Sequence, residues 1–476
     1  MVASIHRESS NHPFWGRRAC VMALCMLVCV FLIPESSVSA DEPDMIMLSG
    51  SPDQIGTTWA KINKQSIIQF VNTAWLDRAK EAGIDRQTLI QRGARYVEIV
   101  EKIAPHWLEE SRAVARETGL DQELYLAFCG SVSRSRFLKA SPEEDEIIEC
   151  TSFAVPQDKT KGRAIFFHKT RDNTDYPQVA VIVDNATPGV NKLIAIADIG
   201  ALRGFSMAVN EKGLAVAGDY PAHKKKDSST LVLPKAQPKF RGLMAGEILR
   251  YIVEKASTSQ EALDILTDFV GKGYYAGGDV NASHWLFVDR NGVIIEVCNN
   301  AEHIVSMVHD KTYFSRFNKS DPAIQLKSAD VVDFAMFRNV SRERPVVTRQ
   351  SISGMTVEID PDYPELLTVA WVSIPARVAA YPIFMGQKRM PEPWLNGQAY
   401  AAGKLTANYN QDNWKAHKAR FAEIEAQMHQ EKEQLVNDVR ESIEAGNPRD
   451  ADIEMLEAFS REQARRLMSI LKDLAK

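Results

Sequence analysis

Two β-type runs decide the fold: Glu149-Cys150-Thr151-Ser152-Phe153-Ala154-Val155 and, after a turn, Gly162-Arg163-Ala164-Ile165-Phe166-Phe167-His168-Lys169-Thr170-Arg171-Asp172-Asn173. Between the strand-like residues 150–155 and 164–168 lies a polar segment that ends in glycine, which predicts a hairpin. Paired antiparallel strands lie only about 5 Å apart. We therefore expect the second strand to bring Arg171 and Asp172 back to the neighbourhood of the Cys150 thiol.

Cys150 has the chemistry of a nucleophile if a base lies beside it. A thiol attacks at neutral pH only when a base or a favourable charge makes the thiolate available. If Cys150 were the first residue of a mature chain, its own α-amine, with an ordinary pKa of about 7.7–8.0, would be that base. A carboxylate such as that of Asp172 could hold the amine in place. The alternative is a buried core cysteine, which is common in strands.

Further strand-like runs follow the hairpin. Asn210-Glu211-Lys212-Gly213 and Asp289-Arg290-Asn291-Gly292 each predict a hairpin turn, with glycine at the position that needs a positive φ. A helix predicted at 242–255 and extended at 259–269 interrupts the strands. The pattern indicates an α+β domain of largely antiparallel sheets with helices packed on them. The remaining predicted strands are 179–183, 193–196, 207–209, 214–217, 285–288 and 293–297.

Helical patterns flank the strands on both sides. Within residues 58–130, apolar residues recur at three- and four-residue spacing, and we expect Gly119 to end one helix and Asp121 to cap the next. An acidic linker at 141–146 precedes Cys150. After about residue 412, two apolar stripes separated by Gly446-Asn447-Pro448 predict a helical hairpin. These stripes are Phe421, Ile424, Met428, Leu435 and Val439, then Ile453, Leu456, Phe459, Leu467 and Leu471.

The first forty residues have the order of a secretory signal peptide. Arg17 and Arg18 precede an apolar run at 19–34, and Ser37-Val38-Ser39-Ala40 offers a small-residue cleavage site. The apolar run is short for a membrane span, which needs about 20 residues. We expect cleavage near Ala40 and a secreted or periplasmic protein, with an uncleaved N-terminal anchor as the alternative.

Charge and cysteine content exclude several functions. The net charge is −5, and no basic block is longer than Lys224-Lys225-Lys226, so the chain lacks the electrostatic footprint of a nucleic-acid-binding protein. Three of the six cysteines lie in the predicted signal peptide. The other three (Cys129, Cys150 and Cys298) are too few for a disulfide framework. No CxxC or HExxH cluster is present, so we predict neither a metal nor a cofactor.

Four motifs in order resemble one enzyme family. They are Cys150-Thr151-Ser152-Phe153-Ala154, the segment 162–172, the string at 210–218 (Asn-Glu-Lys-Gly-Leu-Ala-Val-Ala-Gly), and Asn281-Ala282-Ser283-His284-Trp285 followed by the turn at 289–292. They resemble the acyl-coenzyme A:6-aminopenicillanate acyltransferase family of N-terminal-nucleophile (Ntn) hydrolases and its relatives, the penicillin V acylases and bile salt hydrolases. The segments 107–115 and 118–120 resemble the helical prosegment of the acyltransferase branch.

The resemblance implies roles for individual residues. Cys150 would be the nucleophile, freed by self-cleavage of the Glu149–Cys150 bond, and Asp172 would position the new amine. Asn281 would donate to the oxyanion, and Arg171 would pair with Asp172 or with a substrate carboxylate. Arg377 stands where the relatives carry an arginine. The family asparagine after Ala-Gly-x is missing here, which implies that Asp219 or Tyr220 lines the site instead.

The expected organisation is an Ntn-type αββα sandwich of antiparallel sheets with helical additions at both ends. Its segments are a signal peptide (1–40), a helical prosegment (41–149), a catalytic domain (150–395) and a helical C-terminal extension (396–476). The expected activity is cleavage of a non-peptide C–N amide bond of a small N-acyl substrate through a Cys150 acyl-enzyme, or transfer of the acyl group to an amine. The alternatives are a secreted dipeptidase-like Ntn peptidase and a non-catalytic Ntn-fold binding protein.

Other residues have simpler interpretations. Cys129 and Cys298 are expected in the core, and Arg171 with Asp172 could be only a surface ion pair. His284 could be the base of a papain-like cysteine–histidine pair, and the chain also carries His168, His303 and His309. We favour the Ntn interpretation because a papain-like nucleophile opens a helix, whereas Cys150 opens a predicted strand.

Overall fold

The structure is a computed structural model of the 476-residue chain. It describes residues 43–130, 150–172, 178–200, 202, 204–219, 231–237, 239, 241–276, 282–348, 350–395, 397–406 and 414–474. The predicted signal peptide, the acidic linker, Glu149, Tyr220 and Asn281 lie outside these residues. Within the described residues, no helix has the length and apolar character needed to cross a membrane.

One sheet joins eight of the described strands in the order β1-β4-β5-β6-β7-β8-β9-β10. All neighbours are antiparallel except β1 and β4, which are parallel. Gly213 and Gly292 have φ of 79° and 78° in the two turns where the sequence predicts hairpins. The strands are β1 (Met45–Gly50), β4 (Gln178–Asn185), β5 (Leu193–Asp198), β6 (Phe205–Asn210), β7 (Ala215–Asp219), β8 (Ser283–Val288), β9 (Ile294–Asn299) and β10 (Ile304–His309).

The second sheet, six-stranded within the described part of the chain, has the order β11-β2-β3-β12-β13-β14 and is antiparallel throughout. The hairpin predicted from the deciding stretch is its β2–β3 pair, in which Thr151 lies opposite Thr170 and Ser152 opposite Lys169. The strands are β2 (Thr151–Val155), β3 (Ile165–Asp172), β11 (Tyr313–Phe314), β12 (Ser351–Ile359), β13 (Val369–Ser373) and β14 (Tyr381–Phe384).

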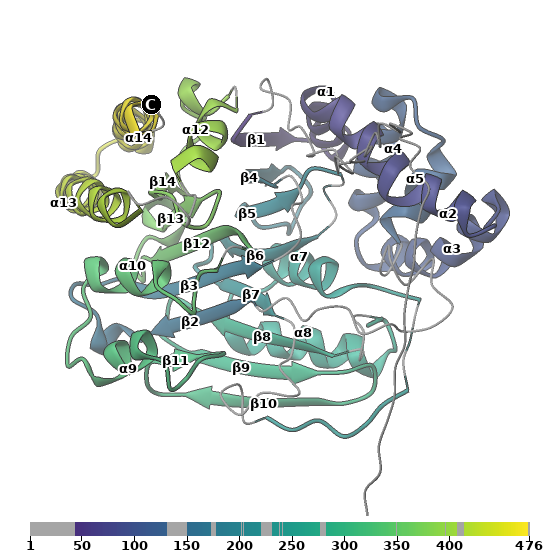
Figure 1. Cartoon of the computed structure of the whole chain (residues 1–476), viewed down its shortest axis with the longest axis horizontal. Helices are drawn as coiled ribbons and strands as arrows, with labels where there is room; N and C mark the ends of the chain where they lie inside the picture. Colours follow the sequence, from purple (N-terminus) through teal and green to yellow (C-terminus); the bar gives the residue numbers. More distant parts are fainter. Residues whose placement is uncertain are drawn as a thin grey trace, which may run out of the picture. The chain divides into compact units, whose positions relative to one another are not determined.

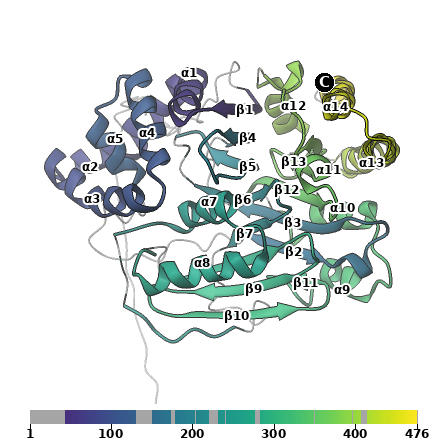
Figure 2. The ribbon, with the colours of Figure 1, turned by 180° about the vertical axis from the view of Figure 1, so that it is seen from behind.

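One layer of helices covers the outer face of the first sheet (Figures 1 and 2). Its apolar side chains form a core with Val179, Val181 and other residues on that face of the strands. Gly119 ends α4 with a φ of 78°, and the Asp121 side chain caps α5 at Leu124 N, as the sequence predicts. The layer contains α1 (Pro52–Val71), a π-helical turn (Asn72–Leu76), α2 (Asp77–Glu81), α3 (Arg86–Ile103), α4 (Pro105–Thr118), α5 (Gln122–Cys129), α7 (Ala245–Lys255) and α8 (Ser259–Gly271).

A second layer of helices covers the outer face of the second sheet (Figure 1). The predicted C-terminal hairpin is present as α13 and α14, whose apolar stripes pack into the same core as β12, β13 and β14. The layer contains α9 (Asp321–Ser328), α10 (Phe334–Arg342), α11 (Pro364–Leu367), α12 (Gln398–Thr406), α13 (Trp414–Glu444) and α14 (Arg449–Leu474); short 3₁₀ turns lie at Gln157–Lys159 and Glu392–Trp394.

Apolar residues fill the space between the two sheets as well. Ile182 and Ile194 of the first sheet lie in the same buried cluster as Val155 and Val357 of the second. The layers are therefore helix, sheet, sheet, helix, which confirms the predicted αββα arrangement of mainly antiparallel sheets.

The N-terminal segment departs from a purely helical addition. Met45-Ile46-Met47-Leu48 forms β1 and pairs with β4, from Met45 opposite Ala180 to Gly50 opposite Asn185. Ser51 and Gln54 then form a capping box that starts α1. Segment 41–149 thus contributes an edge strand to the first sheet in addition to α1–α5.

Candidate active site

Cys150 stands immediately before β2 and is only 7% exposed. Its Sγ lies 3.8 Å from the backbone carbonyl oxygen of Asp172, toward which the thiol can donate. Ser315 Oγ accepts a hydrogen bond of 2.9 Å from the Ser152 N–H and so anchors the beginning of β2. The β2–β3 register therefore returns Asp172 to the thiol, as expected from the sequence.

Asp172 ends β3 with a buried side chain. Burial raises the pKa of its carboxyl to about 6, although a hydrogen bond from Ser351 and the positive charges of Lys169 and Arg316 act in the opposite direction. Ser351 lies opposite Asp172 in the β12–β3 pair, and its hydroxyl donates to Oδ1. Asp172 is thus a fixed carboxylate with a pKa just below neutrality.

Lys169 and Asp219 form a fully buried ion pair beside the thiol. Lys169 Nζ lies 2.5 Å from Asp219 Oδ1, donates to the Thr170 carbonyl at 3.0 Å, and interacts electrostatically with the Cys150 side chain. Burial alone would lower the pKa of Lys169, but Asp219 and Cys150 outweigh it, so the pKa is raised. Burial would also raise the pKa of Asp219, but Lys169 and His284 outweigh it and lower that pKa. Both groups are therefore charged.

Asp219 holds further polar groups in the space between the sheets. Its Oδ2 accepts a hydrogen bond of 2.6 Å from Ser152 Oγ and lies 3.5 Å from His284 Nδ1. On its other side, His284 Nε2 lies 3.0 Å from Glu296 Oε1 and 2.9 Å from the Tyr313 hydroxyl. Burial alone would lower the pKa of His284, but Asp219 and Glu296 outweigh it, so the pKa is raised. His284 is thus bound to two carboxylates of this network.

His168 lies among aromatic side chains on the other face of β3. Its ring centroid is 4.8 Å from that of Phe153 and 6.4 Å from that of Phe337 in α10. Both ring nitrogens hydrogen-bond to threonine hydroxyls, at 2.8 Å each. Burial, together with the charges of Arg338 and Lys169, holds the pKa of His168 well below its usual value. It is a neutral core residue.

Arg171 belongs to a second polar group between the sheets. Its guanidinium binds both oxygens of Asp198 in β5, at 2.6 and 3.2 Å. Gln178 also donates to Asp198 and accepts a hydrogen bond of 2.7 Å from Ser353 Oγ. Alternation along β3 puts Arg171 on the face of Lys169. A substrate carboxylate would meet Arg171 already paired with Asp198.

Arg377 is buried in the loop between β13 and β14. The neighbouring residue Ala376 packs over Gly354 of β12. If Gly354 carried a Cβ atom, that atom would lie 3.6 Å from the Ala376 methyl group. Gly354 lies opposite Thr170 of β3. Arg377 therefore belongs to a loop packed against the strand pair that carries Asp172.

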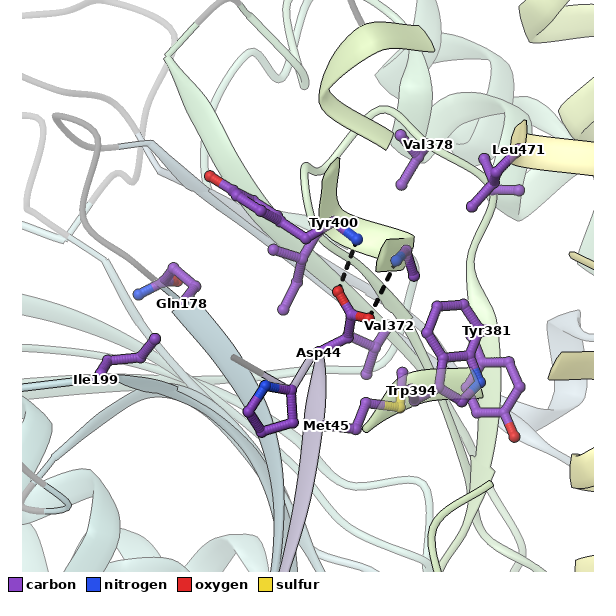
Figure 3. Close-up of a pocket in the computed structure, with 14 residues that line it drawn as sticks. Asp44, Met45, Gln178, Ile199, Val372, Val378, Tyr381, Trp394, Tyr400 and Leu471 are labelled. Atoms are coloured by element: carbon purple, nitrogen blue, oxygen red, sulfur yellow. Dashed lines mark hydrogen bonds between the residues drawn. The ribbon is translucent and has the colours of Figure 1, made fainter. Parts of the chain in front are cut away.

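A small cavity lies beside the first strand (Figure 3). It has a volume of about 30 Å³ and is bordered by Asp44, Gln178, Ile199, Val372 and Tyr381 among others. That is room for one or two waters. Asp44 accepts hydrogen bonds from the N–H groups of Ala399 (3.2 Å) and Tyr400 (2.6 Å) at the start of α12, while burial raises its pKa to about 7. The cavity joins the N-terminal segment to the C-terminal one and is too small for a substrate.

No protein-family model matches the chain, and no curated protein matches it in sequence. Solved structures similar to it in part include penicillin V acylase from Agrobacterium tumefaciens (13% identity, 50% of this chain and 86% of that one, TM-score 0.33). Others are a conjugated bile acid hydrolase variant from Clostridium perfringens (12%, 50% and 94%, 0.35) and the Caenorhabditis elegans ortholog of N-acylethanolamine-hydrolyzing acid amidase (12%, 45% and 94%, 0.31). At these TM-scores the likeness decides neither the fold nor the function of this chain. The fold is described from the structure of the chain, and the function is inferred from its own residues.

The structure adds residues that sequence reasoning missed. Lys169, Ser351 and Arg316 act on Cys150 or Asp172. Lys169 lies inside the segment 162–172 but was given no role there, and Ser351 and Arg316 lie outside the four motifs. Lys169 carried one usable signal, because a lysine inside a strand of buried residues needs a partner. Ser351 and Arg316 follow Cys150 by more than 150 residues and carried none. Asp219, named as a residue that lines the site, is in this network.

Proposed function

We propose that the protein is an exported cysteine Ntn hydrolase that cleaves the amide bond of a small N-acyl substrate, with Cys150 as its nucleophile. The observation that carries the proposal is the place of one buried thiol, immediately before β2 and beside both the Lys169 ammonium and the end of β3. A cation beside sulfur favours the thiolate, the form that attacks. Of the other cysteines in the described residues, Cys129 ends α5 and Cys298 lies inside β9, so neither opens a strand.

The base in this proposal is the α-amine of Cys150 itself. Cleavage of the Glu149–Cys150 bond would free it, and an α-amine has an ordinary pKa of about 7.7–8.0. A base must lie within about 3 Å of the thiol or of one bridging water, and an amine on the same residue meets that condition. With a pKa of about 6, Asp172 is largely ionised at pH 7–8 and can hold the amine.

The reaction follows from these groups. The thiol proton passes to the α-amine, and the sulfur attacks the amide carbonyl carbon to give a tetrahedral oxyanion. Asn281 is proposed to donate to that oxyanion, a contact typically worth about 3–4 kcal/mol in the transition state. The amine product then leaves with the proton, and water, or a second amine in the acyltransferase variant, releases the acyl group. Arg171 and Arg377 are proposed to contribute positive charge to the site.

The proposal is tested by trapping the acyl-enzyme. The wild-type protein is mixed with chromogenic N-acyl amides of different chain length, quenched with acid and digested for mass spectrometry. We expect the acyl mass on the peptide that contains Cys150, and neither adduct nor turnover in Cys150→Ala. Cys298→Ala is the matched control, because Cys298 is also buried. Turnover of dipeptides alone would favour the peptidase, and a folded protein inert to both would favour a binding protein.

A further inference from the structure

We propose that His284, Glu296 and Cys298, with His309 as a fourth ligand, bind a divalent transition-metal ion such as Zn²⁺. The four residues lie on β8, β9 and β10, at the end of the first sheet farthest from β1. This site adjoins the Asp219 network through His284, but no step of the proposed amide chemistry uses its four ligands.

The strand register brings these side chains together. His284 lies directly opposite Cys298 in the β8–β9 pair. Glu296 is two residues from Cys298 and so points to the same face of β9. His309 lies opposite Ile294 in the β9–β10 pair, and Ile294 also shares that face. The sequence contains no compact metal motif because its four candidate ligands come from three strands.

The distances fit a closed site. The candidate ligand atoms of His284, Glu296 and Cys298 all lie within 4.8 Å of one another, and all three residues are buried. His309 Nε2 lies 2.9 Å from the second oxygen of Glu296, with 22% of its side chain exposed. In tetrahedral zinc sites with bonds of about 2.0–2.3 Å, the ligand atoms are about 3.5 Å apart. A small inward movement of His284, Glu296 and Cys298 would therefore coordinate an ion, and a larger movement of His309, which contacts Glu296, would complete the set.

The donor types of the four proposed ligands also fit a zinc site. Two imidazoles, a thiolate and a carboxylate are the donors that tetrahedral Zn²⁺ takes from proteins. The thiolate and the carboxylate together balance the charge of the ion. His284 would bind through Nε2 with its Nδ1–H directed at Asp219 Oδ2, 3.5 Å away. A carboxylate behind a metal-bound histidine is the usual arrangement that fixes the ring.

A second group of possible metal ligands in the molecule differs from the first in its neighbouring charges. Glu358, His429 and Glu433 also lie close enough together to hold an ion. There, however, Lys432 Nζ lies 2.8 Å from Glu358 and also contacts Glu433. The lysine ammonium already supplies the positive charge at that place. Glu296, by contrast, is paired with two imidazoles, which are themselves metal ligands.

The test uses the purified full-length protein after dialysis against a chelator. Cobalt(II) is added and the ultraviolet spectrum recorded, because a thiolate-to-cobalt charge-transfer band reports a cysteine ligand. We expect one Co²⁺ per chain, displacement by Zn²⁺, and loss of the band in Cys298→Ser. The band should persist in Cys129→Ser and Cys150→Ser, which remove the other two cysteines of the described residues.

His309→Gln gives a second variant with less risk of misfolding, since His309 is partly exposed. We expect it to weaken Zn²⁺ binding at least tenfold, measured by competition with a chromophoric chelator, with an unchanged circular dichroism spectrum. The proposal is overturned if the wild type binds no Co²⁺, if the band survives in Cys298→Ser, or if folded His309→Gln binds Zn²⁺ as tightly as wild type.

Discussion

The Lys169 ammonium lies 2.5 Å from the Asp219 carboxylate, and both side chains are completely excluded from solvent. Removing one member of such a pair leaves an uncompensated buried charge, which typically costs about 3–5 kcal/mol. Lys169 also contacts Cys150. Loss of either member of the pair should therefore both destabilise the folded protein and change the electrostatic surroundings of the Cys150 thiol.

Lys169→Met should slow alkylation of Cys150 by iodoacetamide at pH 7 by about tenfold or more, because the buried cation beside the sulfur is lost. Lys432→Met is the matched control, since Lys432 is also a buried lysine paired with a carboxylate but contacts Glu358. Both variants should lose similar stability in urea, and only the first should lose thiol reactivity. Equal slowing in the two would assign the effect to general destabilisation.

Asn281→Ala should lower kcat on N-acyl amides by about a hundredfold or more, because one oxyanion donor is lost. The control is Asn291→Ala, an exposed asparagine in the turn after β8. It should stay within about twofold of wild type. If Asn281→Ala also stays within twofold while folded, the oxyanion donor is another group.

Asp172→Asn should reduce kcat/KM far more than any change to a histidine outside the Asp219 network. The neutral amide cannot hold an ammonium, whereas His168 is a neutral core residue and His303 is partly exposed. His168→Gln and His303→Gln should stay within about tenfold of wild type. A folded and correctly processed histidine variant with no activity would argue for a cysteine–histidine pair instead.

Stability should fall as the pH rises from 5 to 8. The pKa of Asp44 is raised to about 7 and that of Asp172 to about 6, so the folded state holds protons that the unfolded state has released above about pH 4. The raised pKa of His284 acts in the same direction, whereas the lowered pKa of His168 acts in the opposite direction between pH 5 and about 6.5, where the unfolded imidazole is protonated.

Thermal unfolding followed by circular dichroism between pH 5 and 8 checks this dependence. Asp44→Asn should flatten the slope, because the carboxyl that titrates beside α12 is removed. A midpoint that rises steadily with pH in the wild type, or an unchanged slope in Asp44→Asn, would contradict these assignments.

Local patterns predicted much of the fold. The deciding hairpin, the turns at Gly213 and Gly292, the end of α4 at Gly119 and the C-terminal hairpin all follow from spacing and turn residues. The helix that Gly119 ends is short, because Pro105 starts it and Ala104 separates it from the preceding helix α3. The place of β1 could not be predicted, since its partner β4 lies more than 120 residues away.

The residues of the candidate site likewise fall into those that local sequence patterns predict and those that they do not. Cys150 and Asp172 were predictable because a single hairpin joins them. The pairing of Arg171 with Asp198 and of Lys169 with Asp219 depends on how the two sheets face each other, which no local pattern encodes. The sequence suggested Asp172 as a partner for Arg171, but the structure pairs that guanidinium with β5.

The most direct test of the proposed chemistry is N-terminal sequencing with intact-mass measurement of the purified wild type and of Cys150→Ala. We expect the wild type to contain a chain beginning at Cys150, and Cys150→Ala to remain joined across residues 149 and 150. An active wild-type protein with an intact Glu149–Cys150 bond would contradict the proposal, because Cys150 would then have no free α-amine to act as the base.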